Sequence, residues 1–215
     1  MRSDKFRLPQ PVRTDEGSLV FDGWQAWEKL DGQHEHGRWP EIIEACIDFH
    51  AAIVNQPVPD YFESRDQNPW VIADKITWGE LDHLEYDPRI APAVEALHNC
   101  LKPIEYQDQL IHGDFSGNVM FADGQPPAVI DFSPYWRPVP FAVGVIVADA
   151  IVWGRAEESL IETGGQFEDF DQHLARAELR RVLELEMIHR QFGANIIPQI
   201  KAHWPLIEMI VDRCL

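Results

Sequence analysis

Apolar residues recur at the 3.6-residue period of a helix in several parts of the chain. The first such stripe follows Pro40 and consists of Ile43, Cys46, Ile47, His50 and Ile53. Proline is favoured in the first turn of a helix, where its missing N–H group is not needed. The pattern therefore predicts a helix that starts at Pro40 and carries His50 on its buried face, where a hydrogen-bonded core histidine is expected.

A second helix is predicted after Asp87 and Pro88, which suit a helix cap and a first helical position. Its apolar stripe consists of Ile90, Val94, Leu97 and Leu101. Residues 55–87 before it contain prolines, aromatic residues and acids without a sustained period. We therefore expect a long surface excursion there, with one short helix over residues 77–84.

The last third of the chain is predicted to be mostly helical. Residues 139–153 are apolar on all sides apart from Asp149, which predicts a buried helix. A long helix with one apolar face follows over residues 171–192 and stops at Gly193. One or two final helices are expected over residues 195–215.

Short strand patterns complete the set of predicted elements. The pair Asp22-Gly23, typical of a type I′ turn, separates residues 18–21 from residues 24–28 and predicts a hairpin. The other expected strands are residues 109–111, 118–121 and 128–130. Because a Gly- and Pro-rich turn joins the last two, they are expected to pair. The elements together predict an α+β fold, mainly helical around small strands.

The sequence contains 36 acids against 18 Lys and Arg residues, a formal net charge of −18. Nucleic acids need a basic footprint on their protein partners, so we exclude them as partners. A small cationic ligand suits this charge, and acids such as Glu184 and Glu186 on the long helix are candidates to bind it. Solubility alone also accounts for the acidity, with these acids exposed to solvent.

Three cysteines, Cys46, Cys100 and Cys214, lie far apart and have no metal-binding spacing. We interpret them as unpaired thiols of a cytoplasmic protein, since disulfides are rare in reducing compartments. No apolar leader follows Met1, and the run 139–153 is too short to cross a bilayer. We therefore expect neither a secretory leader nor a membrane as partner.

The residues with the clearest chemistry lie between the expected strands. His112-Gly113-Asp114 suggests a tight turn, Asn118 follows it, and Asp131 comes directly after the last strand. An aspartate on such a turn can accept a proton from a substrate hydroxyl. An asparagine and a second aspartate supply the hard oxygen ligands that Mg²⁺ prefers. The pattern therefore predicts a site for a magnesium nucleotide.

These motifs resemble the aminoglycoside phosphotransferase and choline kinase-like enzymes, which share the protein-kinase architecture and the signature H-G-D-x-x-x-x-N followed by I-D-[FW]. The resemblance covers about residues 18–160. It implies that Asp114 is the catalytic base and that Asn118 and Asp131 hold Mg²⁺ on ATP or GTP. His112 would hold the catalytic turn and would not act as the base.

Two features depart from the family pattern. Asn118 follows Asp114 by four positions and not by five, which shortens the loop by one residue. The N-terminal lobe of the family, with its phosphate loop and anchoring lysine, is mostly missing, and Lys5, Lys29 and Lys75 are poorly placed to replace that lysine.

The resemblance divides the chain into residues 1–30, a remnant of the N-terminal lobe formed by hairpin and hinge, and residues 31–215, the kinase-like catalytic lobe. In the family the hinge binds adenine through its backbone, which implies this role for Glu28, Lys29 and Leu30. A plain hairpin packed on the helical body explains the same residues. We expect an exposed apolar face where the lobe would sit, suited to a homodimer or to a partner that supplies the lobe.

The resemblance also assigns residues after Asp131. The proline-rich loop 133–140 corresponds to a region that faces the acceptor, which implies that Tyr135, Trp136 or Arg137 lines the acceptor pocket. Asp149 needs a partner, because an unpaired buried carboxylate costs several kcal/mol. In kinase-like folds an aspartate on the corresponding helix ties down the catalytic turn, which implies that Asp149 supports the turn here.

Three functions agree with these residues. The first is transfer of the terminal phosphoryl group of ATP or GTP to a hydroxyl of a small molecule, with Asp114 as base. The second is a catalytically inactive or truncated kinase-like binding module, suggested by the missing lobe. The third is metal-dependent hydrolysis, in which Asp114, Asp131 and His112 would direct water to the phosphate.

Overall fold

Helix α4 (Val139–Val152) is the centre of the computed structural model, which describes residues 3–62, 64, 68–82 and 85–214. All residues from Phe141 to Ala150 are buried, because neighbouring elements cover the helix on every side. Helix α5 (Phe170–Phe192) approaches α4 at Gly144, where a Cβ atom would lie 3.1 Å from the carbonyl oxygen of His173. The apolar run 139–153 is thus a buried helix, as predicted.

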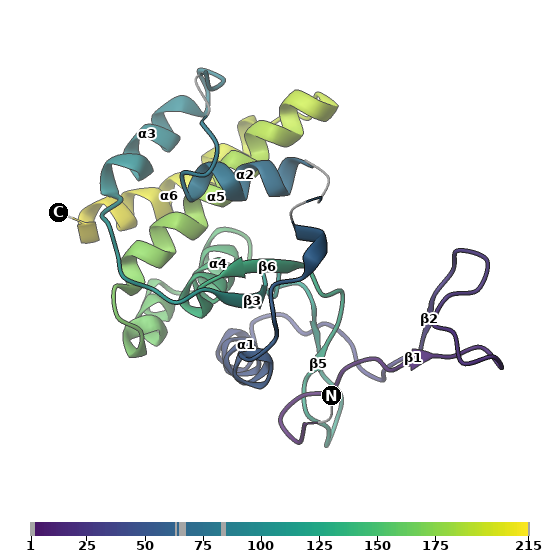
Figure 1. Ribbon diagram of the computed structural model, residues 1–215. Helices are drawn as coiled ribbons and strands as arrows, with labels where there is room; N and C mark the ends of the chain where they lie inside the picture. Colours follow the sequence, from purple (N-terminus) through teal and green to yellow (C-terminus); the bar gives the residue numbers. More distant parts are fainter. Residues whose placement is uncertain (1–2, 63, 65–67, 83–84, 215) are drawn as a thin grey trace.

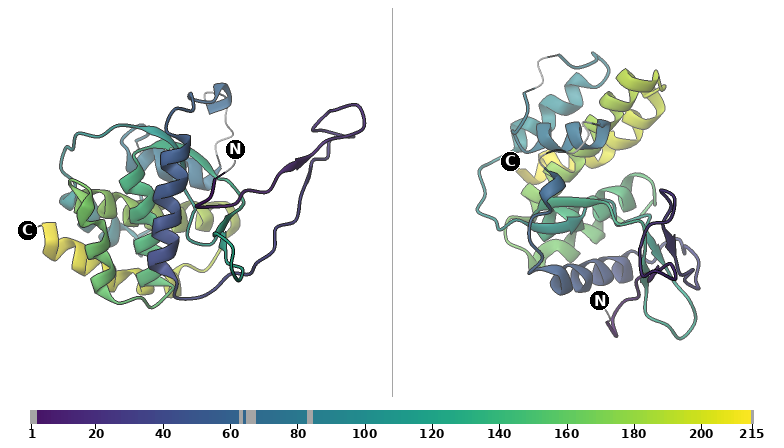
Figure 2. Two further views of the ribbon diagram at one scale, coloured as in Figure 1. Left: turned by 90° about the horizontal axis from the view of Figure 1, so that it is seen from below. Right: turned by 45° about the vertical axis from the view of Figure 1, so that its right-hand side comes forward.

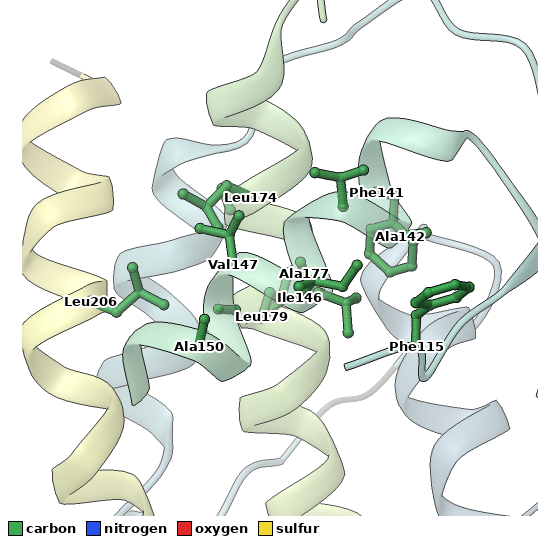
Figure 3. Close-up of a cluster of buried hydrophobic side chains, with 14 of the residues drawn as sticks. Phe115, Phe141, Ala142, Ile146, Val147, Ala150, Leu174, Ala177, Leu179 and Leu206 are labelled. Carbon is green, nitrogen blue, oxygen red and sulfur yellow. The ribbon is translucent and has the colours of Figure 1, made fainter. Parts of the chain in front are cut away.

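The contact between α4 and α5 forms the main core. Figure 3 shows Leu174, Ala177 and Leu179 of α5 beside Ile146 and Val147 of α4, and all five side chains are fully buried. Helix α5 ends at Gly193, which has a φ of +67°. Glycine adopts this left-handed conformation without strain, so the predicted stop is confirmed.

Further helices surround this pair (Figure 1). They are α1 (Trp39–Ile53), α2 (Pro69–Thr77), α3 (Ala91–Cys100) and α6 (Ile197–Cys214), with 3-10 helices η1 (Asp60–Phe62) and η2 (Glu158–Gln166). Helix α1 packs against α4, whereas α2, α3 and α6 pack against α5. Helix α5 therefore has contacts with α2, α3, α4 and α6.

The strands form three small antiparallel pairs. Strand β3 (Gln109–His112) pairs with β6 (Pro134–Arg137), and β4 (Val119–Met120) pairs with β5 (Ala128–Val129). The predicted pairing of the strands on either side of the Gly- and Pro-rich turn is confirmed by the second pair. The chain between β3 and β4 and the chain between β5 and β6 contain the motifs singled out above.

The third pair forms an arm that extends away from the helical body (Figures 1 and 2). Strand β1 (Pro11–Val12) pairs with β2 (Ala26–Trp27). The predicted two-residue turn is present, since Asp22 and Gly23 have φ values of +48° and +80° and Phe21 bridges to Trp24. The predicted strand over residues 18–21 is wrong, because β2 pairs with the earlier β1 instead.

The arm exposes several large apolar side chains. They are Val12, Leu19, Val20, Phe21, Trp24 and Trp27, and Trp24 is 79% exposed. These side chains belong to the proposed lobe remnant itself, so the apolar face expected where the missing part of the lobe would sit stays a prediction. A hairpin packed on the helical body was the alternative, and the arm does not pack in that way (Figure 2).

Three local predictions require correction. The short helix expected over residues 77–84 lies earlier, at α2, because Asn68 accepts a hydrogen bond from the N–H of Val71 and Pro69 occupies the first turn; residues 83 and 84 lie outside the described residues. Helix α3 begins at Ala91 and not at Pro88. The carboxylate of Asp87 binds Arg89 instead of capping a helix.

The third correction concerns residues 134–137, which form β6 and not a loop. Their backbone pairs with β3 over four residues, and this partner is distant in sequence. The architecture as a whole is the predicted α+β fold, mainly helical with small antiparallel strand pairs.

The three cysteines do not form disulfides with one another. Cys46 and Cys100 are buried, Cys214 is half-buried, and all three are free thiols, as expected. Among the described residues, no helix has both the length and the apolar character needed to cross a membrane.

Candidate active site

The His-Gly-Asp turn follows β3 directly and is fixed by side chains from distant elements. Phe115 in the turn is fully buried and lies beside Phe141 and Ala142 of α4 (Figure 3). Gly113 lies so close to Tyr135 that a Cβ atom on it would be 2.3 Å from Cδ2 of that ring. This close approach explains why glycine occupies the centre of the motif.

The backbone of Gly113 is held on both sides. Its N–H donates to the carbonyl oxygen of Ser133 at 2.8 Å, and its carbonyl oxygen accepts from Nη1 of Arg180 at 2.9 Å. Arg180 is fully buried, pairs with Glu184 at 2.8 Å and lies over the Tyr135 ring. A buried arginine on α5 therefore fastens the turn to the helical core.

His112 is fully buried and bonds to backbone groups through both ring nitrogens. Nε2 donates to the carbonyl oxygen of Ile130 at 3.1 Å, and Nδ1 accepts from the N–H of Asp114 at 3.3 Å. Burial lowers the pKa of His112, so the ring is neutral. These contacts hold the turn and leave no ring nitrogen for a metal ion, which disfavours metal-dependent hydrolysis with His112 as a ligand.

His50 is the hydrogen-bonded core histidine that the helical stripe predicted. Its Nδ1 donates to the carbonyl oxygen of Cys46 at 2.7 Å, and its Nε2 accepts from the N–H of His112 at 2.9 Å. Burial lowers the pKa of His50 to about 3. The neutral ring thus connects helix α1 to the end of β3, just before the turn.

Asp114 lies at the surface of the turn, and its side chain is 47% exposed. Its Oδ1 accepts a hydrogen bond of 2.8 Å from Nη2 of Arg181. Burial alone would raise the pKa of Asp114, but the charge and hydrogen bond of Arg181 outweigh it, so the pKa lies below the usual range. The carboxylate is therefore ionised and partly open to solvent, as a proton acceptor must be.

Asn118 lies directly before β4, and Asp131 lies two residues after the end of β5. Nδ2 of Asn118 donates to the backbone carbonyl of Asp114 at 2.6 Å. The N–H of Ile130 donates to the carbonyl of Asn118 at 3.0 Å, which joins the two segments directly before Asp131. Asp131 is exposed and has a φ of +49°, a strained conformation that is enriched at functional sites.

Asp149 has the partners that its burial required. Its Oδ1 accepts from Nε of Arg181 at 2.9 Å, and its Oδ2 accepts from Nη2 of the same residue and from Oγ of Ser116, both at 2.5 Å. Ser116 belongs to the turn, so Asp149 contacts the turn through a side chain. The expected bond from Asp149 to the backbone of the turn is not among the contacts of the described residues.

Sequence reasoning missed Arg180, Arg181 and Ser116. The lone Asp149 in an apolar helix required a partner, but the requirement does not say which of many distant cations supplies it. Adjacent arginines inside the buried face of a helix were the signal available, because arginine is seldom buried without a partner.

Glu184 and Glu186 are buried on α5 and are not solvated. Their exposed fractions are 5% and 0%. Glu184 pairs with both Arg180 and Arg181, and Glu186 pairs with Arg190 at 2.5 Å. The expectation that these acids face solvent is therefore wrong, because both are buried ion-pair partners; Glu184 also lines the cavity of about 360 Å³ described below.

The hinge residues Glu28, Lys29 and Leu30 follow the arm and do not join the turn. The N–H of Glu28 donates to the carbonyl oxygen of Gln10 at 2.8 Å, which joins the start of the hinge to the arm. The chain returns to the body shortly afterwards, where Gln33 bridges to Phe121 after β4. The hinge is thus connected to the motif segments by only a few residues.

Tyr135, Trp136 and Arg137 lie on β6 with different surroundings. Tyr135 is buried against Gly113, whereas Arg137 is ion-paired with Asp74 at 2.6 Å and with Glu80 at 2.7 Å. All three line a cavity of about 240 Å³ next to α2. The guanidinium of Arg137 is therefore engaged by the protein itself.

A second cavity, of about 360 Å³, reaches the turn directly. Its lining residues come from the turn and from helices α1, α4, α5 and α6: Trp39, Ser116, Gly117, Asp149, Trp153, Arg181, Glu184, Leu185, Ile188 and His203. Aromatic side chains from α1 and from the end of α4 thus share a cavity with the residues that hold the turn.

Comparison with known proteins places this geometry in context. A model of the phosphotransferase enzyme family (APH) matches residues 2–135, more than half of the chain. No curated protein sequence matches the chain.

Solved structures are similar over almost the whole chain. The amicoumacin kinase hAmiN in complex with AMP-PNP, Ca²⁺ and Ami has a TM-score of 0.58 at 14% identity, over 97% of this chain and 73% of that chain. The AMP-bound spectinomycin phosphotransferase APH(9)-Ia has a TM-score of 0.56 at 14% identity, over 95% and 78% of the two chains. Its complex with ADP and spectinomycin has a TM-score of 0.54 at 14% identity, over 97% and 76%. At this identity the likeness concerns the fold, and it confirms the predicted kinase-like architecture.

Proposed function

The chain belongs to the phosphotransferase enzyme family, and from this premise we propose that it transfers the terminal phosphoryl group of ATP or GTP to a hydroxyl of a small molecule, with Mg²⁺ bound. Asp114 receives the proton of the hydroxyl. Asn118 and Asp131 bind the metal. His112 holds the turn that presents Asp114, and Asp149 supports the same turn through Ser116.

The observation that carries this proposal is the hydrogen bond of 2.6 Å from Nδ2 of Asn118 to the carbonyl oxygen of Asp114. A carbonyl oxygen only accepts hydrogen bonds, so the NH₂ group of the amide faces it and Oδ1 is left for another partner. One short turn therefore carries both the base and an oxygen suited to a metal ion. This arrangement supports the function although the spacing is one residue shorter than in the family signature.

The donor atoms suit Mg²⁺. The amide oxygen of Asn118 and the exposed carboxylate of Asp131 are hard oxygen ligands, and no hydrogen bond within the described chain engages the Asp131 carboxylate. Among the described residues, no group of three or more His, Cys, Asp or Glu side chains can hold a metal by itself. Mg²⁺ commonly uses one or two protein ligands together with phosphate oxygens and water, and when bound it neutralises phosphate charge.

The proposed reaction is balanced as a transfer from the nucleotide to the acceptor. The hydroxyl proton passes to the carboxylate of Asp114 while a lone pair on the hydroxyl oxygen forms the bond to the terminal phosphorus. The bond from that phosphorus to the bridging oxygen breaks, and its electron pair stays with the departing diphosphate. Help from a general base contributes about 10²–10⁴ in rate.

The acceptor is proposed to be a small molecule with a hydroxyl group. The solved neighbours include a kinase and a phosphotransferase named for amicoumacin and spectinomycin, which supports this class. A cationic acceptor suits the net charge of −18. Two cavities are available to it: the one next to the turn, with Trp39 and Trp153, and the one on β6, where Tyr135, Trp136 or Arg137 was expected to meet substrate.

We further propose that residues 1–30 act as the remnant of a nucleotide-binding lobe and residues 31–215 as the catalytic lobe. Glu28, Lys29 and Leu30 then contact the nucleotide base through their backbone. The exposed apolar side chains of the arm, such as Phe21 and Trp24, are suited to contact with a second copy or with a partner that completes the nucleotide site.

Nucleotide binding and transfer test the proposal separately. A Mg²⁺ complex of AMP-PNP should raise the melting temperature of the native protein, because a ligand at 100 times its Kd stabilises a fold by about 2.7 kcal/mol. Asp131→Ala should lose this rise, whereas Asp123→Ala, in the exposed turn between β4 and β5, should keep it.

Transfer is then measured with radiolabelled ATP and GTP against a panel of hydroxyl-bearing small molecules, both cationic and neutral. Asp114→Asn should bind AMP-PNP normally and lose at least about 100-fold in turnover. Binding without transfer by the native protein would favour the inactive binding module. Absence of binding and an inert Asp131→Ala substitution would refute the proposed function.

A further inference from the structure

Arg181 on helix α5 is the residue that contacts the carboxylate of the proposed base. It lies 67 positions after Asp114 in sequence, and its side chain is only 13% exposed. Its guanidinium group pairs with three carboxylates, those of Asp114, Asp149 and Glu184, at 2.8, 2.5 and 2.9 Å. No family signature noted above includes this residue.

Two of the three carboxylates hold the guanidinium in place. Asp149 binds both Nε and Nη2, a bidentate arrangement that fixes the plane of the group. Glu184 binds Nη1 and is itself held by Arg180 at 2.8 Å. Both acids are at most 9% exposed, so these pairs are far less screened than surface pairs. The donor that reaches Asp114 therefore belongs to a rigid group.

The carboxylate of Asp114 is, by contrast, poorly fixed by anything else. Its side chain is 47% exposed, and within the described chain Arg181 supplies the hydrogen bond made to its oxygens. The other polar side chains nearby bind elsewhere: Arg180 donates to the carbonyl of Gly113, and His112 binds backbone groups. Without Arg181, the side chain of Asp114 would be free to change rotamer.

The hydrogen bond from Arg181 also engages only one of the two carboxylate oxygens of Asp114. Oδ1 accepts from Nη2, whereas Oδ2 accepts no hydrogen bond within the described chain. A base for a hydroxyl must reach the proton at hydrogen-bond distance, about 2.6–3.2 Å, in one defined orientation. An anchor on one oxygen gives this orientation and leaves the other oxygen available.

We propose that Arg181 is a positioning residue for phosphoryl transfer: anchored by Asp149 and Glu184, it holds Oδ1 of Asp114 so that Oδ2 receives the proton of the acceptor hydroxyl. The inference rests on the proposed function, because it assigns Asp114 as the base. It adds a distant helix to the groups that determine turnover. Ser116 donates to Oδ2 of Asp149, which also accepts from Arg181, so Ser116 connects the Arg181–Asp149 pair to the turn.

Arg181→Ala tests the proposal through turnover and through chemical rescue. Displacement of a reacting group by about 1 Å can cost about 100-fold in rate, so kcat should fall by about that factor while the Kd for Mg²⁺·AMP-PNP stays within twofold. Added guanidinium or ethylguanidinium ion should recover at least tenfold of the lost kcat by filling the vacated position. Arg181→Lys, which keeps the charge, should retain more activity than Arg181→Ala.

Two further variants separate positioning from loss of stability. Arg190→Ala is the matched control, because it also removes an arginine of α5 from a buried glutamate, Glu186, without touching the turn. Its kcat should remain within threefold of the native value. If Arg181→Ala does not fold, the double variant Arg181→Ala with Asp149→Asn removes the uncompensated charge, and it should show the same loss of kcat and the same rescue.

A readout without turnover separates this inference from the proposed function. Three-bond couplings from Hα to the Hβ atoms of Asp114, assigned by comparison with Asp114→Asn, report its χ1 rotamer. The native protein should show one rotamer, and Arg181→Ala should show averaged couplings that guanidinium restores. If the native protein transfers no phosphoryl group, the proposed function fails while the couplings still decide the role of Arg181. A single rotamer in Arg181→Ala, or a kcat equal to that of Arg190→Ala, would overturn the inference.

Discussion

Replacement of Gly113 by alanine should damage both the stability of the fold and the geometry of the turn. A Cβ atom at this position would lie 2.3 Å from Cδ2 and 2.7 Å from Cε2 of Tyr135. Carbon atoms in contact are normally about 3.5–4.0 Å apart, so the ring or the turn must move by about 1 Å. The ring has little freedom to move, because Tyr135 is 6% exposed and Arg180 lies over its face.

The expected loss of stability follows from overpacking. Insertion of one methyl group into a well-packed region typically costs about 1–3 kcal/mol. For a chain of this length each kcal/mol corresponds to about 2–4 °C in melting temperature, which gives a fall of about 2–12 °C. If the turn moves instead of the ring, Asp114 shifts with it, and turnover should fall by about 100-fold.

Urea unfolding and phosphotransfer assays measure the two effects. The control for stability is Gly117→Ala, because a Cβ atom there meets nothing within 4 Å although the residue lies in the same turn. A smaller side chain should also relieve the clash, so Gly113→Ala should cost less in a Tyr135→Leu background than in the native protein. Equal stability of Gly113→Ala and Gly117→Ala would refute the steric argument.

Two other predictions concern buried polar groups. Burial lowers the pKa of His50 to about 3, from about 6.5 in the unfolded chain, so the unfolded chain binds more protons between these values and the unfolding free energy falls as pH drops through this range, by up to about 1.4 kcal/mol per pH unit. In His50→Gln this part of the slope should vanish in urea titrations from about pH 7 to about pH 4, and an unchanged slope would contradict the assignment. Arg137→Ala should cost about 3–5 kcal/mol, because it leaves the 4%-exposed Asp74 without its cation. Urea unfolding checks this loss, and a variant that unfolds normally but has a raised KM for the acceptor would instead show that Arg137 binds substrate.

Elements built from local patterns were predictable from the sequence. The structure confirms the helix after Pro40, the buried helix α4 and the helix end at Gly193. Each of these features depends on residues that are close together in sequence. The turn of Asp22 and Gly23 was likewise visible, since both residues tolerate positive φ.

Pairing between distant segments was not predictable in the same way. Residues 134–137 contain proline and aromatic residues, and only their match with β3, more than twenty positions earlier, makes them a strand. The same limit applies to β1, which has two residues and pairs with β2 across the whole arm. Short strands depend on their partners more than on their own propensity.

The candidate site shows the same difference between residues of a local pattern and partners that are distant in sequence. Its chemical groups, Asp114, Asn118 and Asp131, could be named because their spacing forms a recognisable pattern. The groups that hold Gly113 and Asp114 could not, because Arg180 and Arg181 each lie 67 positions after the residue they bind and many other cations satisfy the same charge requirement. Prediction of such partners needs the packing of α5 against α4 and the turn.

The position of Arg180 and Arg181 late in the chain has a consequence during synthesis on the ribosome. A nascent chain that has emerged as far as Asp131 contains every residue of the recognised motif, yet the arginines that fasten Gly113 and Asp114 are still to be made. The turn can reach its final form only after α5 has emerged and docked. Order at the site should therefore arise late in translation, and protection of the turn from proteolysis in stalled nascent chains should appear only once α5 is outside the exit tunnel.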